Sequence, residues 1–128
     1  MRVYYEDTDV AGVVYYANYL KFMERARTEW LRSIGVDQTR LLDEDRLLFV
    51  ILSTAVNFHK PARFNDLLCV TSEVMDHTRT SFSFRQEIYR EDLEGELLVD
   101  AEARAACLDA QSFRPQRLPA TIVAEVTP

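Results

Sequence analysis

The sequence predicts an α+β fold in which one long helix packs on an antiparallel sheet. Two observations carry this prediction. Residues 16–34 place large apolar side chains at the 3.6-residue spacing of one buried helix face. Residues 47–108 instead alternate apolar and polar side chains in runs separated by turn residues, which is typical of strands. No repeat, low-complexity tract or linker interrupts the sequence, so residues 1–128 are expected to form one domain.

The composition is that of an ordinary globular protein, with 48% hydrophobic and 28% charged residues. The net charge of -6 argues against general nucleic-acid binding, which depends on clustered Lys and Arg. No apolar run reaches membrane-spanning length, and the N-terminus lacks a signal-peptide pattern, so a cytoplasmic location is expected. Cys69 and Cys107 lie far apart in apolar runs and are expected to be reduced core thiols.

The opening segment joins a short strand-like piece, residues 3–5, to the long helix through the acidic and small-residue turn E-D-T-D-V-A-G. The helix is expected to begin at about Tyr16. Gly35 supplies the left-handed stop that commonly follows a helix. The buried face of the helix is expected to carry Tyr19, Phe22, Met23, Ala26, Trp30 and Ile34.

The rest of the chain alternates strands with turns. Residues 36–45 are expected to form a turn and a short helical piece, and the tail from residue 114 an edge strand or a short helix. In the last strand, a row of alanines leaves room on the buried face for a helix pressed against the sheet. The four strands expected after the helix are residues 47–59, 67–75, 81–90 and 96–108.

Residues 5–19, Y-E-D-T-D-V-A-G-V-V-Y-Y-A-N-Y, resemble the active-site signature of the hotdog-fold 4-hydroxybenzoyl-CoA thioesterase family. They are most similar to its YbgC-type branch, the acyl-CoA thioesterases associated with the Tol-Pal gene cluster. E-R-A-R-T-E-W-L-R, P-A-R with the nearby Asp66, and L-P-A-T-I-V-A-E-V extend the resemblance over nearly the whole chain. The chain begins only three residues before Tyr4 and is shorter there than its relatives, so we expect either a clipped first strand or a misassigned start codon.

The resemblance implies a hotdog fold, in which one long helix is wrapped by about five antiparallel strands. It also implies a homodimer or homotetramer, because long exposed sheet edges invite pairing. The expected substrate is an acyl-CoA, with the acyl site at a subunit boundary. No cofactor is expected beyond the coenzyme A that the substrate carries, and no metal.

The same resemblance implies the roles of individual residues. Asp9 matches the family's catalytic carboxylate, as general base or nucleophile. Tyr16 matches the residue whose backbone N–H, at the start of the helix, faces the thioester carbonyl oxygen. Many YbgC-type sequences carry His at this position, so only a backbone role transfers to Tyr16. Substrate and CoA contacts are implied for Gly12, Val13, Arg63, Arg79, Thr80 and Ser81.

Structural interpretations compete with the catalytic one. Asp and Thr before a helix commonly cap it, but Asp9 lies about seven residues ahead of the expected helix start, which is too far for an ordinary cap. Asp7 is expected to hold the turn through hydrogen bonds. Glu24 is expected to pair with Arg27 at i+3.

Two other functions remain open at this level. A hydratase or dehydratase of acyl thioesters needs a His paired with a carboxylate, and neither His59 nor His77 lies in the opening turn or helix. These histidines also lack metal-ligand spacing. The third possibility is a non-catalytic acyl-binding or scaffold module of the cell-envelope Tol-Pal system.

Overall fold

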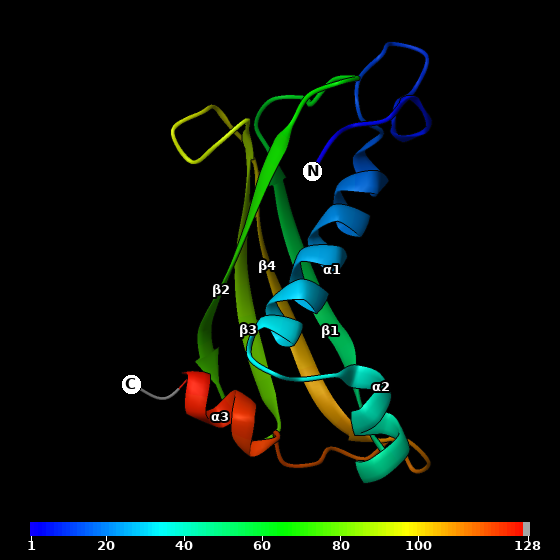
Figure 1. The fold of residues 1–128 in the computed structure, drawn as a ribbon, viewed down its shortest axis with the longest axis vertical. Helices are drawn as coiled ribbons and strands as arrows, with labels where there is room; N and C mark the ends of the chain where they lie inside the picture. Colours follow the sequence, from blue (N-terminus) through cyan, green and yellow to red (C-terminus); the bar gives the residue numbers. More distant parts are fainter. Residues whose placement is uncertain (127–128) are drawn as a thin grey trace.

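An antiparallel sheet forms one layer of the molecule, and the long helix α1 (Tyr16–Ser33) crosses one of its faces (Figure 1). The structure, a computed structural model, describes residues 1–126, so residues 127 and 128 of the predicted tail lie outside the described residues. The sheet has the strand order β1-β4-β3-β2 within the described chain. Its strands are β1 (Leu47–Phe58), β2 (Leu68–His77), β3 (Ser81–Arg90) and β4 (Leu97–Asp109).

Helix α1 forms where the periodicity predicts it and packs through the predicted face. Gly35 has a φ of 88°, and the N–H of Val36 donates back to the Leu31 carbonyl at 2.9 Å, which ends the helix as expected. Leu31 is buried although it was not among the predicted residues, and the predicted residues Ala26, Trp30 and Ile34 are only half-buried. The fully buried residues of the helix are Tyr19, Phe22, Met23 and Leu31.

The central strands β3 and β4 carry the inner face on which α1 rests. β3 has the predicted bounds, and its inward residues Phe82, Phe84, Gln86 and Ile88 are buried. The alanines of β4 at positions 101, 103 and 105 are buried as well. Ala101 lies in the same core cluster as residues of α1, so the small side chains accommodate the helix as predicted.

Gln86 anchors a polar contact between helix and sheet that changes one expectation. Its amide nitrogen donates to the Met23 carbonyl at 2.9 Å, and its amide oxygen accepts from Nη1 of Arg27 at 2.9 Å. Arg27 therefore bonds to Gln86 across the core, and the predicted pairing of Arg27 with Glu24 is wrong. Arg27 is partly buried against the sheet, whereas Glu24 is exposed and accepts from the Thr28 hydroxyl at 3.0 Å.

The predicted first strand is reduced to a single bridge. Arg2 pairs with Leu67 in an isolated antiparallel bridge. The chain then turns away from the sheet at η1 (Tyr5–Asp7), because the Asp7 carboxylate accepts the N–H of Tyr4 at 3.0 Å. The sheet of the described chain therefore has four strands, where about five were expected.

Short helices gather at one end of the sheet, opposite the N-terminal turn (Figure 1). Helix α2 (Gln38–Arg40) continues into the short π-helix η2 (Leu41–Asp45), and together they form the expected short helical piece. The tail forms a helix, α3 (Ala120–Val126), and not an edge strand. Among residues 1–126, none of the helices combines the length and the apolar character that crossing a membrane requires.

Candidate active site

The acidic turn before α1 folds back on itself as a tight hairpin. Thr8 forms an antiparallel bridge with Val14, and the N–H of Asp9 donates to the Val13 carbonyl at 2.9 Å. Gly12 closes the hairpin with a φ of 77°, a conformation that glycine adopts without strain. A Cβ at Gly12 would meet no atom within 4 Å, so backbone conformation and not lack of space selects glycine.

The carboxylate of Asp9 is exposed, and one of its two oxygens accepts a hydrogen bond. Oδ1 accepts the N–H of Ala11 at 2.8 Å, which is an Asx turn. No donor within residues 1–126 hydrogen-bonds to Oδ2, so this oxygen is available to a bound molecule. The capping interpretation of Asp9 is wrong, because the N-cap of α1 is Tyr15 and no side chain caps the helix.

Tyr16 is the first residue of α1, and its backbone N–H is a donor with no intrahelical acceptor. Two nearby N–H groups are engaged: that of Tyr15 donates to the Asp7 carbonyl at 3.0 Å, and that of Asn18 donates to the Tyr15 carbonyl at 2.9 Å. Within residues 1–126, no group accepts from the N–H of Tyr16. The available N–H of Tyr16 therefore lies at the positive end of the helix dipole, directly after the hairpin that holds Asp9.

Asp7 holds this turn through both its carboxylate and its carbonyl. The carboxylate accepts from Tyr4, and the carbonyl accepts from the N–H of Tyr15 and from the Asn18 side-chain amide at 2.9 Å. These bonds agree with the expected structural role of Asp7. They tie the start of the hairpin to the first turn of α1.

The loop of residues 61–66 supports the hairpin from behind. The Ala62 carbonyl accepts the N–H of Val14 at 2.8 Å, and the Ala62 N–H donates to the Tyr19 hydroxyl at 2.9 Å. Val13 also forms an isolated bridge with Arg63. The P-A-R motif indicated this loop from the sequence, whereas the periodicity indicated Tyr19 only as a core residue. The Tyr19 hydroxyl is seen to accept a hydrogen bond from the loop only in the structure.

A hollow of about 260 Å³ opens beside the first turn of α1. Its walls include Val14, Tyr16, Tyr19 and Phe58. The Phe58 ring lies 6.3 Å from that of Tyr16 and 5.6 Å from that of Tyr19, measured between ring centroids. An aromatic wall beside an available N–H donor suits a ligand that combines a carbonyl oxygen with an apolar group.

The other predicted contact residues divide between the two ends of the sheet. Ser81 pairs with Ala106 of β4, and Phe58 pairs with Val99, seven residues away on the same strand. At a strand rise of about 3.3 Å per residue, the two ends are about 23 Å apart. Gly12, Val13 and Arg63 lie at the hairpin end, and Arg79, Thr80 and Ser81 lie at the other, in and after the β2–β3 turn.

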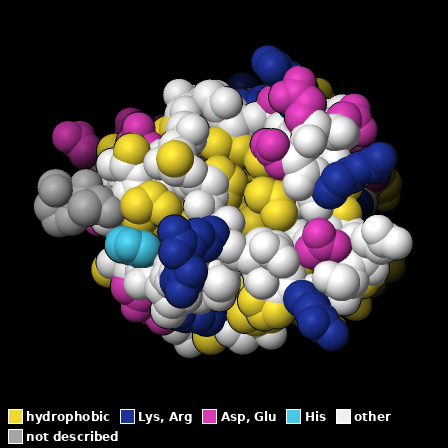
Figure 2. All heavy atoms as spheres, turned by 90° about the horizontal axis from the view of Figure 1, so that it is seen from below, with side chains coloured by type: hydrophobic (Ala, Val, Ile, Leu, Met, Phe, Trp, Pro, Cys, Tyr) yellow, Lys and Arg dark blue, Asp and Glu magenta, His cyan; other side chains and the backbone are white. Residues whose placement is uncertain are grey.

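A second, larger hollow of about 1020 Å³ lies at the far end, with Arg79 and Arg117 in its lining. On this face of the molecule, basic and acidic side chains both lie around exposed hydrophobic atoms (Figure 2). Ser81 takes no part in the lining: it is buried, and its hydroxyl accepts from Nη2 of Arg104 at 3.0 Å. Arg79 and Arg117 therefore supply the positive charge of this hollow.

A histidine–carboxylate pair, which the sequence did not indicate, lies on the sheet. Nε2 of His59 contacts Oδ2 of Asp100, and the side-chain amide of Asn57 donates to Oδ1 at 3.0 Å. The hydrogen bonds from His59 and then from Asn57 hold the pKa of Asp100 below its ordinary value. Asp100 alternates with the buried residues Val99 and Ala101, so it faces away from α1. No group of three or more potential metal ligands occurs within residues 1–126.

Comparison with known families identifies the superfamily of this chain. A model of the thioesterase superfamily matches residues 11–96. The chain belongs to the thioesterase superfamily. This thioesterase is 44% identical over 125 residues to the acyl-CoA thioester hydrolase YbgC of Escherichia coli O157:H7, which covers 98% of this chain and 91% of that protein.

Two further comparisons agree with this assignment. The thioesterase is 41% identical over 124 residues to the acyl-CoA thioesterase YbgC of Haemophilus influenzae, covering 97% of this chain and 89% of that protein. The crystal structure of Slr0204, a 1,4-dihydroxy-2-naphthoyl-CoA thioesterase from Synechocystis, superposes with a TM-score of 0.90 at 24% identity, over 98% of this chain and 91% of that chain. The predicted hotdog fold and the resemblance to YbgC-type thioesterases are confirmed.

Proposed function

We propose that this thioesterase hydrolyses acyl-CoA thioesters to a free acid and CoA at the hairpin before α1. The observation that carries the proposal is the shared hairpin: it holds an exposed carboxylate, Asp9, and it leads directly into the available N–H of Tyr16. The identity of 44% to an acyl-CoA thioester hydrolase supports CoA thioesters as the substrate class. The aromatic hollow beside Tyr16 provides room for the acyl group.

The N–H of Tyr16 is the proposed donor to the oxyanion. As the thioester carbonyl is attacked, its oxygen gains negative charge, which the N–H and the helix dipole stabilise. One such donor in a dry site contributes about 3 kcal/mol to transition-state stabilisation. The phenol ring of Tyr16 has a different part, as a wall of the acyl hollow.

Asp9 supplies the attacking oxygen by one of two routes. As a general base, it takes a proton from water while the water oxygen bonds to the carbonyl carbon. As a nucleophile, its own oxygen bonds to that carbon and forms a mixed anhydride, which water then cleaves. In both routes the C–S bond breaks and CoA leaves as the thiolate, which takes up a proton.

We also propose that the active form is a homodimer joined through β1, with a homotetramer as its further association. β1 is an edge strand, and it leaves Ile51 47% and Leu52 58% exposed. Antiparallel pairing of two β1 edges would reverse one protomer relative to the other. The Arg79 end of one protomer would then lie at the same end as the hairpin of its partner, where its cations suit the phosphates of CoA.

Sedimentation of a charged edge variant tests this assembly. Leu52→Lys should give a lighter species with reduced activity, because a lysine on an edge strand opposes edge-to-edge pairing. Leu93→Lys is the matched control, because Leu93 is 63% exposed in the turn between β3 and β4. An active monomer of the parent protein, or a Leu52→Lys protein that sediments and hydrolyses like the control, would reject the dimer.

The proposed mechanism uses only groups of the chain, so no cofactor is needed beyond the CoA of the substrate. We further propose a cytoplasmic location. Cys69 and Cys107 are free thiols, as suits a reducing compartment, and Cys107 is fully buried.

A hydratase or dehydratase is less well supported. The one histidine–carboxylate pair among residues 1–126 is His59 with Asp100. His59 lines the hollow beside Tyr16, but its carboxylate partner Asp100 lies on the sheet face turned away from α1. Steady release of free thiol from acyl-CoA, with no change in enoyl absorbance, would distinguish hydrolysis from hydration.

Asp9→Asn tests the central assignment. Asn keeps an oxygen for the Ala11 N–H, so the turn should stand, but it can act neither as a base nor as a competent nucleophile. We expect kcat to fall by at least about 100-fold, with little change in KM. Asp92→Asn is the matched control, because Oδ1 of Asp92 accepts the N–H of Glu94 at 2.9 Å in a similar exposed turn.

The outcome that rejects the assignment is a folded Asp9→Asn protein whose kcat is within about tenfold of the parent, a difference of only about 1.4 kcal/mol. A scaffold function would show itself differently. Cell-envelope phenotypes would then survive the Asp9→Asn change while hydrolysis is lost.

A further inference from the structure

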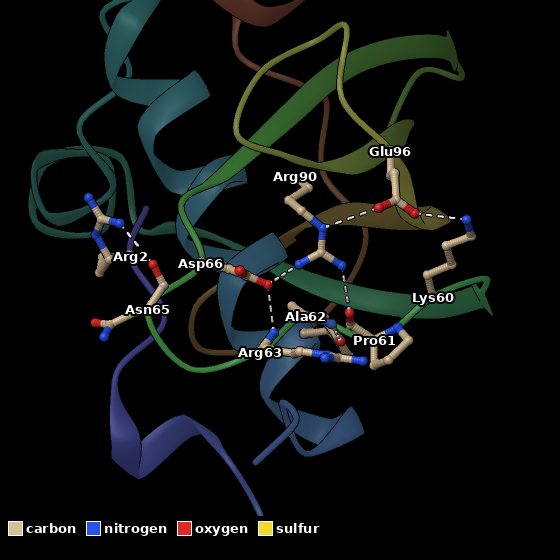
Figure 3. Close-up of polar contacts among 10 residues, drawn as sticks. Arg2, Lys60, Pro61, Ala62, Arg63, Asn65, Asp66, Arg90 and Glu96 are labelled. Carbon is tan, nitrogen blue, oxygen red and sulfur yellow. Dashed lines mark hydrogen bonds and ion pairs between the residues drawn. The ribbon is translucent and has the colours of Figure 1, made fainter. Parts of the chain in front are cut away.

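Arg90, at the end of β3, joins both ends of the loop that supports the hairpin (Figure 3). Its Nη1 contacts the carboxylate of Asp66, and its Nη2 donates to the Pro61 carbonyl at 3.0 Å. Nε lies 3.5 Å from Oε1 of Glu96, whose other oxygen pairs with Lys60 at 2.8 Å. The Arg90 side chain is 25% exposed, so this contact is mostly shielded from water.

Asp66 connects Arg90 to the middle of the loop. Its Oδ2, which contacts Arg90, also accepts the N–H of Arg63 at 2.7 Å. Arg63 lies against Val13, and the preceding residue Ala62 accepts the N–H of Val14. The guanidinium is therefore connected, through the loop, to the strand of the hairpin that runs into α1.

We propose that Arg90 is a positioning residue for thioester hydrolysis. It touches neither Asp9 nor Tyr16. By fixing residues 61–66 it fixes Val13 and Val14, whose backbone groups set the position of Asp9 on one side and of the Tyr16 N–H on the other. The proposal rests on the roles assigned above to Asp9 and Tyr16.

The shape of the guanidinium explains why an arginine stands here. Its planar fork presents separate N–H donors to the Asp66 carboxylate and to the Pro61 carbonyl at the same time. Lysine offers a single point charge and cannot keep both ends of the loop in one geometry. Because reaction rates depend steeply on alignment, a displacement of about 1 Å can cost about 100-fold in rate.

The test compares Arg90→Met and Arg90→Lys with the control Arg85→Met. Arg85 lies on the same strand and pairs with Glu102 at 3.5 Å, away from the loop. Steady-state kinetics on one acyl-CoA give kcat and KM per folded protein. Amide hydrogen exchange, followed by NMR, reports the hydrogen bond from Val14 to Ala62 without reference to activity.

For Arg90→Met we expect kcat to fall by at least about tenfold, with KM within about threefold of the parent. Exchange of the Val14 amide should be at least about tenfold faster, while amides between β3 and β4 keep their rates. Arg90→Lys should lie between Arg90→Met and the parent, and Arg85→Met should match the parent. If Arg90→Met does not fold, Arg90→Lys decides by the same two measurements.

An unchanged kcat overturns the proposal, whether or not Val14 exchanges faster. A lower kcat with unchanged Val14 exchange also overturns it, because the loss would not pass through the loop. Asp9→Asn, assayed in parallel, separates the two proposals. If that variant stays active, the role of Asp9 fails, while Val14 exchange in Arg90→Met still shows whether Arg90 holds the hairpin.

Discussion

Replacing Tyr19 with Phe tests the hydrogen bond that ties the supporting loop to helix α1. The change removes the acceptor of the Ala62 N–H, which lies 2.9 Å from the Tyr19 oxygen. Tyr19 is 3% exposed and Ala62 0%, so water cannot easily replace the hydroxyl. The ring remains, and with it the edge-on contact to Phe22 at 6.2 Å, so the packing energy is largely kept.

The expected loss follows from the burial of the donor. A buried N–H without an acceptor costs about 1–3 kcal/mol, so the free energy of unfolding of Tyr19→Phe should fall by that amount. For a chain of this size, each 1 kcal/mol corresponds to roughly 3–6 °C in Tm. Because oligomers dissociate on unfolding, parent and variant must be compared at one protein concentration.

Urea unfolding, followed by circular dichroism, measures the difference. Tyr89→Phe is the matched control, because the Tyr89 hydroxyl donates to Oε2 of Glu87 at 2.9 Å near the surface. That variant should stay within about 0.5 kcal/mol of the parent. If Tyr19→Phe loses no more stability than Tyr89→Phe, the bond from Ala62 to Tyr19 does not hold the loop. The loop would then not be fixed to α1 in the way that support of the hairpin requires.

Two further predictions concern Tyr16 and the cysteines. Tyr16→Phe keeps the backbone N–H and should keep kcat within about threefold, whereas Tyr16→Pro removes the donor at a helix position that suits proline and should lower kcat by about 100-fold. Equal losses in the two folded variants would assign the role to the hydroxyl. Burial raises the pKa of the Cys107 thiol to about 11, so at pH 8 only about one molecule in a thousand carries the reactive thiolate. Peptide mapping after iodoacetamide treatment of the native protein should therefore show Cys69 modified first, and equal labelling of both cysteines would contradict the burial of Cys107.

The elements whose signals are local could be predicted from the sequence. Helix α1 follows from a periodicity within one continuous segment, and Gly35 marks its end. Strand β3 has the bounds that its alternation predicted. The hairpin motif around Asp9 was likewise readable, since its residues are consecutive and closely match a known family signature. Such patterns survive in the sequence because neighbouring residues determine them.

The contacts between residues far apart in the sequence became visible only in the folded chain. The tertiary structure reduced the first strand to one bridge, because the Asp7 carboxylate starts a turn at the point where the strand would continue. It separated Arg79 from Asp9 by the length of the sheet, which leads to the proposal that a partner subunit completes the site. It joined Arg90 to the loop that supports Val14, across contacts of more than 20 residues in sequence. Such contacts cannot be predicted from the periodicity of the sequence, because they depend on the strand order and on which acceptors lie within reach of a long side chain.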